Sequence, residues 1–259
     1  MSFVRKLGST ALEVSALGLG TVKFGRNSSV KYPDSFDLPG DSEITRLLSC
    51  AKELGINLID TAPAYGTSEE RIGKLLHNRK DWIVATKVGE EFENSISSFD
   101  FSASHTRKSI ERSLKRLRTD YLDIVLVHSD GNDESILHHG ECVDMLKRCR
   151  EEGLIRAIGM SVKSDAGGMA ALEALDIAMI TWNLQQQDTG TVALARKLGK
   201  GILVKKGLLS GHIHDPSRDL VQESMNLAFR EPGIHSMIVG TINLSHLQDN
   251  VAKAKKALS

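Results

Sequence analysis

Charge of one sign, long apolar runs and paired cysteines are all scarce in this sequence. Its 33 basic and 33 acidic residues give a net charge of +0, so electrostatics offers no reason to expect nucleic acid or an anionic membrane as a partner. No apolar stretch is long enough to span a bilayer, and the opening residues MSFVRKLGSTALEV hold no apolar signal segment. We therefore expect a cytoplasmic protein without a membrane anchor.

Potential metal ligands are also too few and too scattered to suggest a metal site. The cysteines form an odd set without metal-like spacing, and we interpret them as reduced thiols. They are Cys50, Cys142 and Cys149. Two histidine pairs have no acidic or cysteine ligands grouped with them, and we expect no metal ion. The pairs are His138 with His139 and His212 with His214.

The sequence does contain a repeated alternation of short apolar runs with stretches of helical length. Such runs between helices are typical of the strands of a parallel sheet. Eight strand–helix units follow one another in 259 residues, which predicts an α/β fold of the (β/α)8 TIM barrel type, as a single domain over residues 1–259. The predicted strands cover residues 17–21, 56–60, 81–87, 121–128, 154–161, 176–183, 201–207 and 236–240.

The segments between these strands are predicted in the same way. Residues 3–17 form two short runs around Gly8, which predicts a hairpin that caps the floor of the barrel. Residues 23–40 hold two prolines and several serines, which is typical of a loop. The predicted helices cover residues 41–54, 68–78, 105–117, 134–152, 165–175, 189–199 and 244–258, and one more ends near Phe229.

Four polar residues stand at or just beyond the carboxyl ends of three predicted strands. Asp60 ends the second strand, Tyr65 lies in the loop after it, Lys87 ends the third strand, and His128 ends the fourth. In a closed barrel the carboxyl ends of the strands meet at one rim, where barrel enzymes keep their active sites. The sequence therefore predicts that a carboxylate, a phenol, an ammonium and an imidazole come together.

These four groups suit the delivery of a proton to a carbonyl oxygen. A tyrosine with an unperturbed pKa of about 10 is a poor acid at neutral pH, and a neighbouring ammonium lowers that pKa. We expect Lys87 to supply this charge and Asp60 to hold Lys87 in place. We expect His128 to orient the carbonyl oxygen or to share its proton. Taken singly, Asp60, Tyr65 and His128 are more often structural, whereas a lysine that ends a buried strand needs a partner or water nearby. The hypothesis therefore depends on their coming together.

The chain resembles the aldo-keto reductase family over nearly its whole length. The likeness is carried by LGLGT at 17–21, GINLIDTAPAYGTSEERIG at 55–73, ATKVG at 85–89, SIERSLKRLRTDYLDIVLVHS at 109–129, GLIRAIGMS at 153–161 and IVGTINLSHLQDNV at 238–251. The resemblance implies an NAD(P)(H)-dependent oxidoreductase that interconverts an aldehyde or ketone and an alcohol. It also implies that Tyr65 is the general acid and that no Rossmann domain is needed for the cofactor.

The resemblance further implies where the cofactor would be held. Ser161 matches a serine that contacts the nicotinamide carboxamide, whereas Val162 and Met179 replace the amide side chains that usually join it. Lys205 stands at the position of a stacking side chain, with Lys206 beside it, and the charge of the one that faces the rim would instead reach the pyrophosphate. The expected cofactor contacts are Gly20, Thr21, Asp60, Ser161, Lys205, Lys206, Leu208, Gly240, Thr241, Asn243, Gln248 and Asn250.

The adenosine end of the expected site bears on the choice between two cofactors. The basic residues that hold a 2′-phosphate in NADPH-specific relatives are absent, since Ile242 and Asn243 follow Gly240 and Thr241, and His246 lies on the next turn. A 2′-phosphate would then rest on hydroxyl, amide and imidazole groups at the start of a helix. We favour NADP(H) and keep NAD(H) as the alternative.

The loops after the strands would line the substrate pocket. Phe92, Phe99 and Phe101 would either form an apolar wall of this pocket or pack against the barrel. We expect a small carbonyl compound or alcohol as the substrate, and a monomer or small homo-oligomer. Two alternatives stay open: a nicotinamide-binding redox sensor or accessory subunit with little turnover, and a structural barrel without a cofactor.

Overall fold

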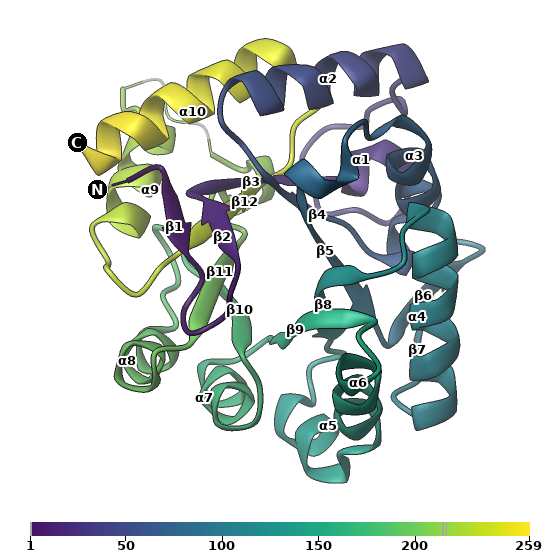
Figure 1. The fold of residues 1–259 in the computed structure, drawn as a ribbon. Helices are drawn as coiled ribbons and strands as arrows, with labels where there is room; N and C mark the ends of the chain where they lie inside the picture. The colour runs from purple at the N-terminus through teal and green to yellow at the C-terminus, as the bar shows by residue number, and fades with distance from the viewer. Residues whose placement is uncertain (1, 214, 216) are drawn as a thin grey trace.

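At the centre of the molecule, eight parallel strands close into a barrel (Figure 1). The computed structural model describes residues 2–213, 215 and 217–259. The barrel strands are β3 (Leu17–Gly20), β4 (Leu58–Asp60), β5 (Ile83–Val88), β8 (Leu122–His128), β9 (Ile155–Ser161), β10 (Ile177–Thr181), β11 (Gly201–Lys205) and β12 (Ser236–Val239). Each barrel strand pairs with the barrel strands that precede and follow it along the chain, and β12 pairs with β3 to close the ring. The predicted (β/α)8 barrel is confirmed.

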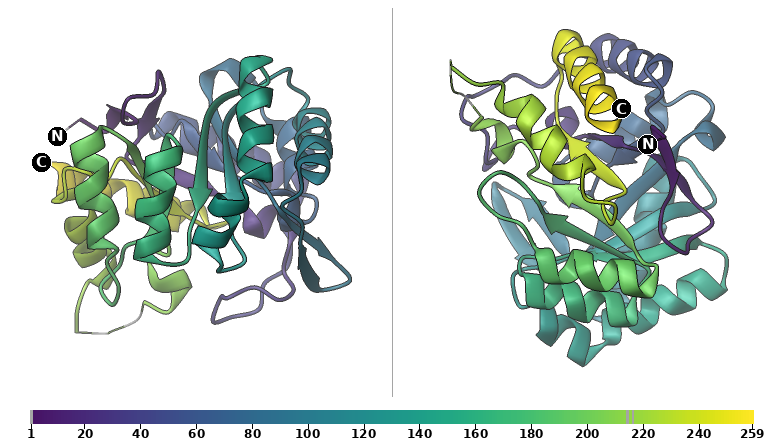
Figure 2. Two further views of the ribbon diagram at one scale, coloured as in Figure 1. Left: turned by 90° about the horizontal axis from the view of Figure 1, so that it is seen from below. Right: turned by 90° about the vertical axis from the view of Figure 1, so that its left-hand side faces the viewer.

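Helices surround the barrel on its outside (Figures 1 and 2). They are α1 (Val22–Gly25), α2 (Asp41–Glu53), α3 (Ser68–Leu75), α4 (Ala103–Leu117), α5 (Asp133–His139), α6 (Glu141–Glu151), α7 (Asp165–Ala174), α8 (Thr189–Leu198), α9 (Leu220–Phe229) and α10 (Leu244–Leu258), with short 3-10 turns at Pro63–Tyr65, Arg79–Asp81 and Leu209–Gly211. Within the described residues, no helix has the length and apolar character needed to cross a membrane.

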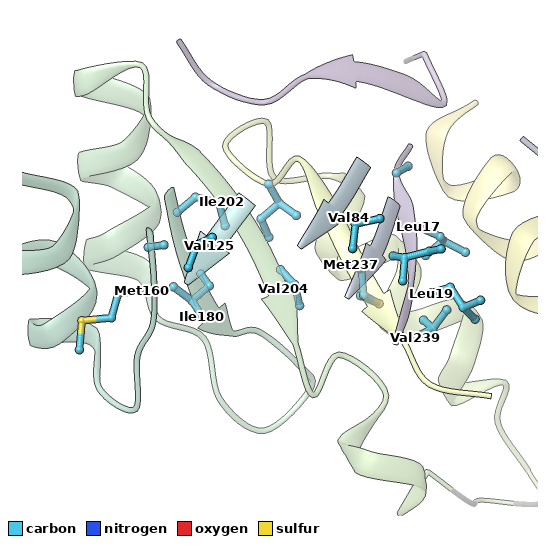
Figure 3. Close-up of a cluster of buried hydrophobic side chains, with 14 of the residues drawn as sticks. Leu17, Leu19, Val84, Val125, Met160, Ile180, Ile202, Val204, Met237 and Val239 are labelled. Atoms are coloured by element: carbon cyan, nitrogen blue, oxygen red, sulfur yellow. The ribbon is translucent and has the colours of Figure 1, made fainter. Parts of the chain in front are cut away.

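Alternation of side chains along each strand divides the core into two clusters, because successive residues point to opposite faces. The outer cluster packs between the strands and the helices, and Leu19, Val125 and Ile180 belong to it (Figure 3). The inner cluster fills the barrel. It includes Leu58, Ala85, Ile124, Leu126, Ala157, Ile177, Met179 and Leu203. Whether a residue stands at an odd or an even position along its strand therefore decides whether it faces a helix or the barrel interior.

The predicted N-terminal hairpin is present and closes one end of the barrel. Strand β1 (Val4–Lys6) pairs antiparallel with β2 (Glu13–Ser15), and Leu7, Leu12 and Val14 join the inner cluster. At the turn, Gly8 has a φ of 55°, and a Cβ there would lie 2.5 Å from the backbone nitrogen of Gly201. Only glycine fits this approach. Because Gly201 begins β11, the hairpin covers the end of the barrel at which the strands start.

Three local features differ from the sequence prediction. Helix α1 lies at the start of the segment predicted as a loop over 23–40. The single helix predicted over 134–152 is two helices, α5 and α6, because the backbone turns at Gly140 with a φ of 72°. Strands β6 (Glu90–Glu93) and β7 (Ile96–Phe99) form a second hairpin where only a loop was expected. This second hairpin leaves the barrel at the end opposite the floor, directly after β5.

Candidate active site

The positions of three predicted site residues follow from the alternation along their strands. Asp60 lies two residues after inward-facing Leu58 on β4, and Lys87 lies two residues after inward-facing Ala85 on β5. His128 follows Leu126 on β8 in the same way. Each of these polar side chains therefore points into the barrel at the carboxyl end of its strand. The core pattern that fills the barrel also aims these groups at one place.

A buried ion pair lies at the base of the site. Nζ of Lys87 donates hydrogen bonds to Oδ1 of Asp60 at 2.6 Å and to the carbonyl oxygen of Thr61 at 2.9 Å. Lys87 is 1% exposed and Asp60 is 5% exposed. Thr21 supports this arrangement from behind, since its Oγ1 donates to the carbonyl oxygen of Asp60 at 2.9 Å. The ammonium is thus held by two oxygens on adjoining residues and has little freedom to move.

Tyr65 lies over this ion pair. It ends a short 3-10 turn that begins at Pro63, and its backbone nitrogen donates to the carbonyl oxygen of Ala62 at 3.0 Å. Nζ of Lys87 lies 4.7 Å from the centre of the Tyr65 ring. The ring of His128 stands edge-on to that of Tyr65, with their centres 6.2 Å apart. The structure therefore brings the four predicted groups together.

The protonation of Tyr65 differs from the sequence prediction. Burial disfavours the phenolate and outweighs the opposing effect of Lys87, so the pKa of Tyr65 rises to about 12. Lys87 also feels burial, but the Asp60 carboxylate and the Tyr65 phenol more than offset it and raise the pKa of Lys87. At neutral pH the protein therefore holds a protonated phenol beside a charged ammonium.

His128 has a carboxylate partner that the sequence prediction did not include. Its Nδ1 lies 2.8 Å from Oε2 of Glu90, the first residue of β6. Burial favours the neutral imidazole and outweighs the attraction of this carboxylate, so the pKa of His128 falls to about 4. Burial alone would raise the pKa of the Glu90 carboxyl group. Contacts with His128, Ser97 and Arg26 outweigh burial and lower this pKa to about 2.

A cavity of about 870 Å³ opens above these groups. All four proton-transfer candidates line it, together with most of the predicted cofactor contacts. The lining residues among those predictions are Gly20, Asp60, Ser161, Lys205, Lys206, Leu208, Gly240, Thr241 and Asn250. Three others are not in its lining: Thr21 supports Asp60, Asn243 caps helix α10 by accepting from Ser245 and His246, and Gln248 is exposed. The size suits a ligand larger than a small aldehyde alone.

Lys205 is turned toward strand β9 and lies deeper in the cavity than Lys206. Its Nζ donates to Oγ of Ser161 at 2.9 Å and makes a short contact with the carbonyl oxygen of Val162. Burial, together with the nearby Lys163 and Lys206, lowers the pKa of Lys205 well below its usual value. Lys206 is exposed at the cavity mouth. The two lysines therefore stand in different environments, although they are adjacent in the sequence.

Several polar residues outside the predicted catalytic and cofactor sets also line the cavity. They are Lys23, Arg26, Lys31, Tyr32, Glu90, Lys163, His246 and Asp249. Those in the loops after β3 and β5, and His246, were expected near the pocket, whereas Lys163 and Asp249 were not. Tyr32 packs on Lys23, whose Nζ lies 4.1 Å from the ring centre, and a Cβ built on Gly240 would lie 2.8 Å from the Tyr32 hydroxyl. The segment after α1 thus reaches across to the end of β12. In the sequence, the signal for these residues was that the segment forms a loop after a strand.

The aromatic residues of the second hairpin pack away from the cavity. Phe99 and Phe101 have their ring centres 6.2 Å apart, and Phe101 packs against the outer core cluster. Phe92 lies under Arg26, whose guanidinium carbon is 3.4 Å from its ring centre. None of the three lines the cavity as the structure describes it; Phe101 packs against the barrel core, as one alternative expected, whereas Phe99 is exposed. Over the described residues, no group of three or more His, Cys, Asp or Glu is placed to hold a metal; His214 lies outside them.

The fold and the groups at its mouth define a class: a parallel (β/α)8 barrel in which a carboxylate, an ammonium, a phenol and an imidazole meet at the carboxyl ends of the strands. The family model for the Aldo/keto reductase family matches residues 16–226, and the chain belongs to this family. Aldo-keto reductases are oxidoreductases that act on carbonyl and alcohol substrates with nicotinamide cofactors. The resemblance found in the sequence is thereby confirmed.

Known relatives and solved structures agree with this assignment. The chain is 26% identical to an uncharacterized oxidoreductase, YqkF, of Bacillus subtilis over 96% of this chain and 90% of that protein. It is 36% identical to L-galactose dehydrogenase of Arabidopsis thaliana over 73% of this chain, but spans only 54% of that protein. It is 32% identical to the NADH-specific methylglyoxal reductase of Escherichia coli over 83% of this chain and 70% of that protein.

Among solved structures, a putative aldo-keto reductase from Pseudomonas aeruginosa is similar to this chain with 52% identity and a TM-score of 0.91, over 100% of this chain and 96% of that one. The aldo-keto reductase AKR11C1 from Bacillus halodurans shares the fold with a TM-score of 0.81 at 22% identity, over 100% of this chain and 95% of that one. The barrel is therefore common to relatives whose sequences have diverged widely.

Proposed function

We propose that this protein interconverts a small aldehyde or ketone and the corresponding alcohol with NAD(P)(H), and that Tyr65 is the general acid. The observation that carries the proposal is the buried Lys87–Asp60 ion pair beside the Tyr65 phenol. A buried ion pair contributes little to stability compared with apolar packing, so its retention in the barrel mouth favours a chemical role. Reduction would need a hydride from the bound cofactor and a proton from the protein.

In this proposal the four residues act on a single proton. Tyr65, held protonated in the free protein, donates from its hydroxyl to the carbonyl oxygen as negative charge develops there. The Lys87 ammonium stabilises the phenolate that remains, and Asp60 keeps the ammonium in position. In the reverse direction the phenolate would accept the proton of the alcohol. His128 stands beside the phenol and would fix the position of the substrate oxygen.

The residues of the cavity fit a long anionic cofactor. Gly20 and Gly240 stand together at its mouth, where a Cβ on Gly20 would lie 3.6 Å from the Gly240 backbone, and neither has a side chain to obstruct a ligand. Lys206 is exposed at this mouth and suits a phosphate. Ser161 and Lys205 lie deeper, where they would hold the nicotinamide end. The residues that would hold the cofactor extend from β9 to β12 across the barrel mouth.

The adenosine end admits either cofactor. Thr241, His246, Asp249 and Asn250 line the cavity there. Thr241 and His246 are able to donate hydrogen bonds to a 2′-phosphate. The Asp249 carboxylate would repel that phosphate, although its ion pair with Lys253 at 2.9 Å reduces the effect. We keep NADP(H) as the favoured cofactor and NAD(H) as possible; the NADH-specific relative shows that the second choice occurs in a similar sequence.

A parallel fluorescence titration with NADPH and NADH, followed by a panel of small aldehydes in the same samples, tests the proposal. We expect tight binding of at least one cofactor and aldehyde-dependent loss of the reduced form. Absence of binding by either cofactor would reject the proposal. The ratio of the two affinities would assign the adenosine end.

The second candidate function is a cofactor-binding sensor or accessory subunit with little turnover. It is supported by the replacement of amide side chains by Val162 and Met179. It is also supported by the hydrogen bond that Lys205 donates to Ser161. A sensor would bind reduced cofactor tightly and leave it unoxidised with every aldehyde in the panel. The intact set of four proton-transfer groups argues for turnover, since a protein that only binds has no need of them.

A further inference from the structure

We propose that Lys163 binds an anionic group of the substrate, so that the carbonyl compound on which this protein acts carries a carboxylate or a phosphate. The inference rests on the proposed function and deepens it, because it names the class of substrate that the same site takes. A lysine ammonium is a point charge without the planar fork of arginine, so both kinds of anion suit it.

Lys163 follows the carboxyl end of β9 and points over the barrel mouth. On this strand the odd-numbered Ala157 faces the barrel interior, whereas the even-numbered Val162, just past its end, belongs to the outer cluster. The same alternation, continued past β9, turns Lys163 inward. The lining of the cavity agrees with this direction, since it includes Lys163 together with Tyr65 and His128.

The backbone that carries Lys163 is held in a fixed position. Its nitrogen donates to Oδ2 of Asp133 at 2.9 Å, and Ser164 donates to the same oxygen from its backbone nitrogen at 3.0 Å and from its Oγ at 2.9 Å. Asp133 begins α5 and is buried. Its carboxylate thus accepts hydrogen bonds from this loop instead of pairing with the Lys163 ammonium, which is left to meet a ligand.

Positive charge in the cavity lining exceeds what the neighbouring carboxylates balance. The acidic residues of the lining already have cations of their own: the pairs are Asp60 with Lys87, Glu90 with Arg26, Asp249 with Lys253, and Asp34 near Lys23. Among the residues that the structure describes, four further lysines of the lining form no ion pair, namely Lys31, Lys163, Lys205 and Lys206. A cleft lined by charges of one sign attracts ligands of the opposite sign.

The charge of Lys163 also reaches the groups around the proposed reaction centre. Burial is the main cause of the lowered pKa of His128 and of Lys205, and the charge of Lys163 acts in the same direction on both. It contributes in the same way at Lys206. An anion bound at Lys163 would offset the repulsion among these lysines, close to the place where the carbonyl group would react.

The position of Lys163 in the ring of strands favours the substrate over the cofactor phosphates. Strands β9 and β3 are four places apart in the ring of eight and stand opposite each other. Gly20 ends β3 and lies near Gly240, where the cofactor would leave the mouth. Ser161 would hold the nicotinamide end, and Lys163 lies two residues beyond it. A substrate whose carbonyl meets Tyr65 would therefore extend its charged group toward Lys163.

Protection from acetylation tests anion binding at Lys163 without requiring turnover. Wild-type protein is treated with limiting acetic anhydride, and mass spectrometry gives the modified fraction of each lysine. Succinate and methyl phosphate serve as unreactive anions and succinamide as the neutral control, each without cofactor and with NADPH or NADH. We expect at least one anion to lower the acetylation of Lys163 several-fold, while succinamide has no effect. Lys197, an exposed lysine on helix α8, should be unchanged throughout.

The same samples distinguish failure of the inference from failure of the proposed function. Protection of Lys163 by a reduced cofactor alone would make it a cofactor ligand and overturn the inference. Equal acetylation of Lys163 with and without both anions would also overturn it. If neither cofactor protected Lys206, the result would count against the proposed function instead, and the samples without cofactor would still decide whether Lys163 binds an anion.

Steady-state kinetics with matched substrates provide the second measurement. We would compare 4-oxobutanoate with its methyl ester, and glyceraldehyde 3-phosphate with glyceraldehyde, because the members of each pair differ in one anionic group. The wild-type protein should have the higher kcat/KM for the charged member of at least one pair, and that pair identifies the anion. Lys163→Gln should lower this value about tenfold, mainly through KM, and leave the neutral member unchanged.

Lys163→Gln alters an exposed side chain and keeps the backbone hydrogen bond to Asp133, so we expect it to fold. Lys197→Gln is the matched control and should keep the preference of the wild-type protein. Equal kcat/KM values within both pairs for the wild-type protein would contradict the inference. An equal loss for charged and neutral substrates in Lys163→Gln would contradict it as well.

Discussion

Oδ1 of Asp60 and Nζ of Lys87 lie 2.6 Å apart inside the barrel mouth, on strands that pair directly with each other. Both side chains are almost completely removed from solvent. Removing one charge of such a pair leaves the other buried without compensation, which usually costs about 3 to 5 kcal/mol. We therefore expect the pair to link the stability of the mouth to the proposed chemistry.

Replacement of Lys87 by methionine tests this link. We expect Lys87→Met to abolish turnover and to reduce the free energy of unfolding by about 3 kcal/mol, because the Asp60 carboxylate loses its partner. Urea unfolding measures the second effect. The double variant Asp60→Asn with Lys87→Met removes both charges and should recover part of the stability but none of the activity. No recovery would mean that the charges do not compensate each other.

Replacement of Tyr65 by phenylalanine tests its role as general acid. The change removes one oxygen and keeps the ring against Lys87 and His128. We expect kcat to fall about 100-fold or more, since positioned proton donors contribute on that order. Affinity for the reduced cofactor should stay near that of the wild-type protein. Equal loss of turnover and cofactor affinity, measured in the same preparation, would identify Tyr65 as a packing residue.

Lys206 is expected to bind a phosphate of the cofactor. Lys206→Gln should weaken binding of the favoured cofactor about tenfold at low ionic strength, which corresponds to about 1.4 kcal/mol. The difference from the wild-type protein should shrink as salt is added, because an exposed charge is screened. Lys197→Gln, an exposed lysine on helix α8, is the control and should leave the titration unchanged. A salt-independent loss would point to a distorted loop.

His235 should make the protein less stable in weak acid. Its Nδ1 accepts a hydrogen bond from the backbone nitrogen of Ile202 at 3.1 Å, and burial with the nearby Arg5 lowers its pKa to about 4. The unfolded chain takes up this proton near pH 6.5 and the folded protein does not until about pH 4. Stability contributed by neutral His235 is thus complete above pH 6.5 and is lost as the pH falls toward 4.

The loss attributable to His235 is roughly 2 kcal/mol between pH 7 and pH 5. We would measure urea unfolding of the wild-type protein and of His235→Gln at both pH values. The comparison separates the effect of His235 from that of His128, because the pKa of His128 is also lowered and both proteins contain it. Glutamine retains an acceptor for the Ile202 nitrogen. We expect the variant to show the smaller decrease. Parallel decreases in the two proteins would contradict the assignment.

The barrel and the location of the site were predictable because both depend on local patterns. Short apolar runs predicted the strands. Because side chains alternate along a strand, Asp60, Lys87 and His128, each two residues after a core residue of the barrel interior, also point inward. Tyr65 required more, since it lies in a turn. Its place in the site was predicted from its closeness in sequence to Asp60, and the family resemblance then implied its role as general acid.

The partners that complete the site were not predictable, because they depend on contacts between distant segments. Glu90 lies next to His128 because it follows β5, the strand that pairs with β8, and the few apolar residues of 90–99 do not give a strand signal. The break at Gly140 was hidden by helix-forming residues on both sides. The pKa of Tyr65 depends on whether burial or Lys87 dominates, and sequence spacing does not reveal the depth of burial.

The hairpin of β1 and β2 seals one end of the barrel with Leu7, Leu12 and Val14, while the groups at the mouth occupy the other end. The floor of the barrel is thus closed by apolar packing alone, at a distance from the groups that line the cavity. A mouth segment such as residues 26–40 adds little entropic cost when it lengthens, because loop closure depends only logarithmically on length. New substrates are therefore accessible by exchange of mouth segments, with the floor and the strands of the barrel left as they are.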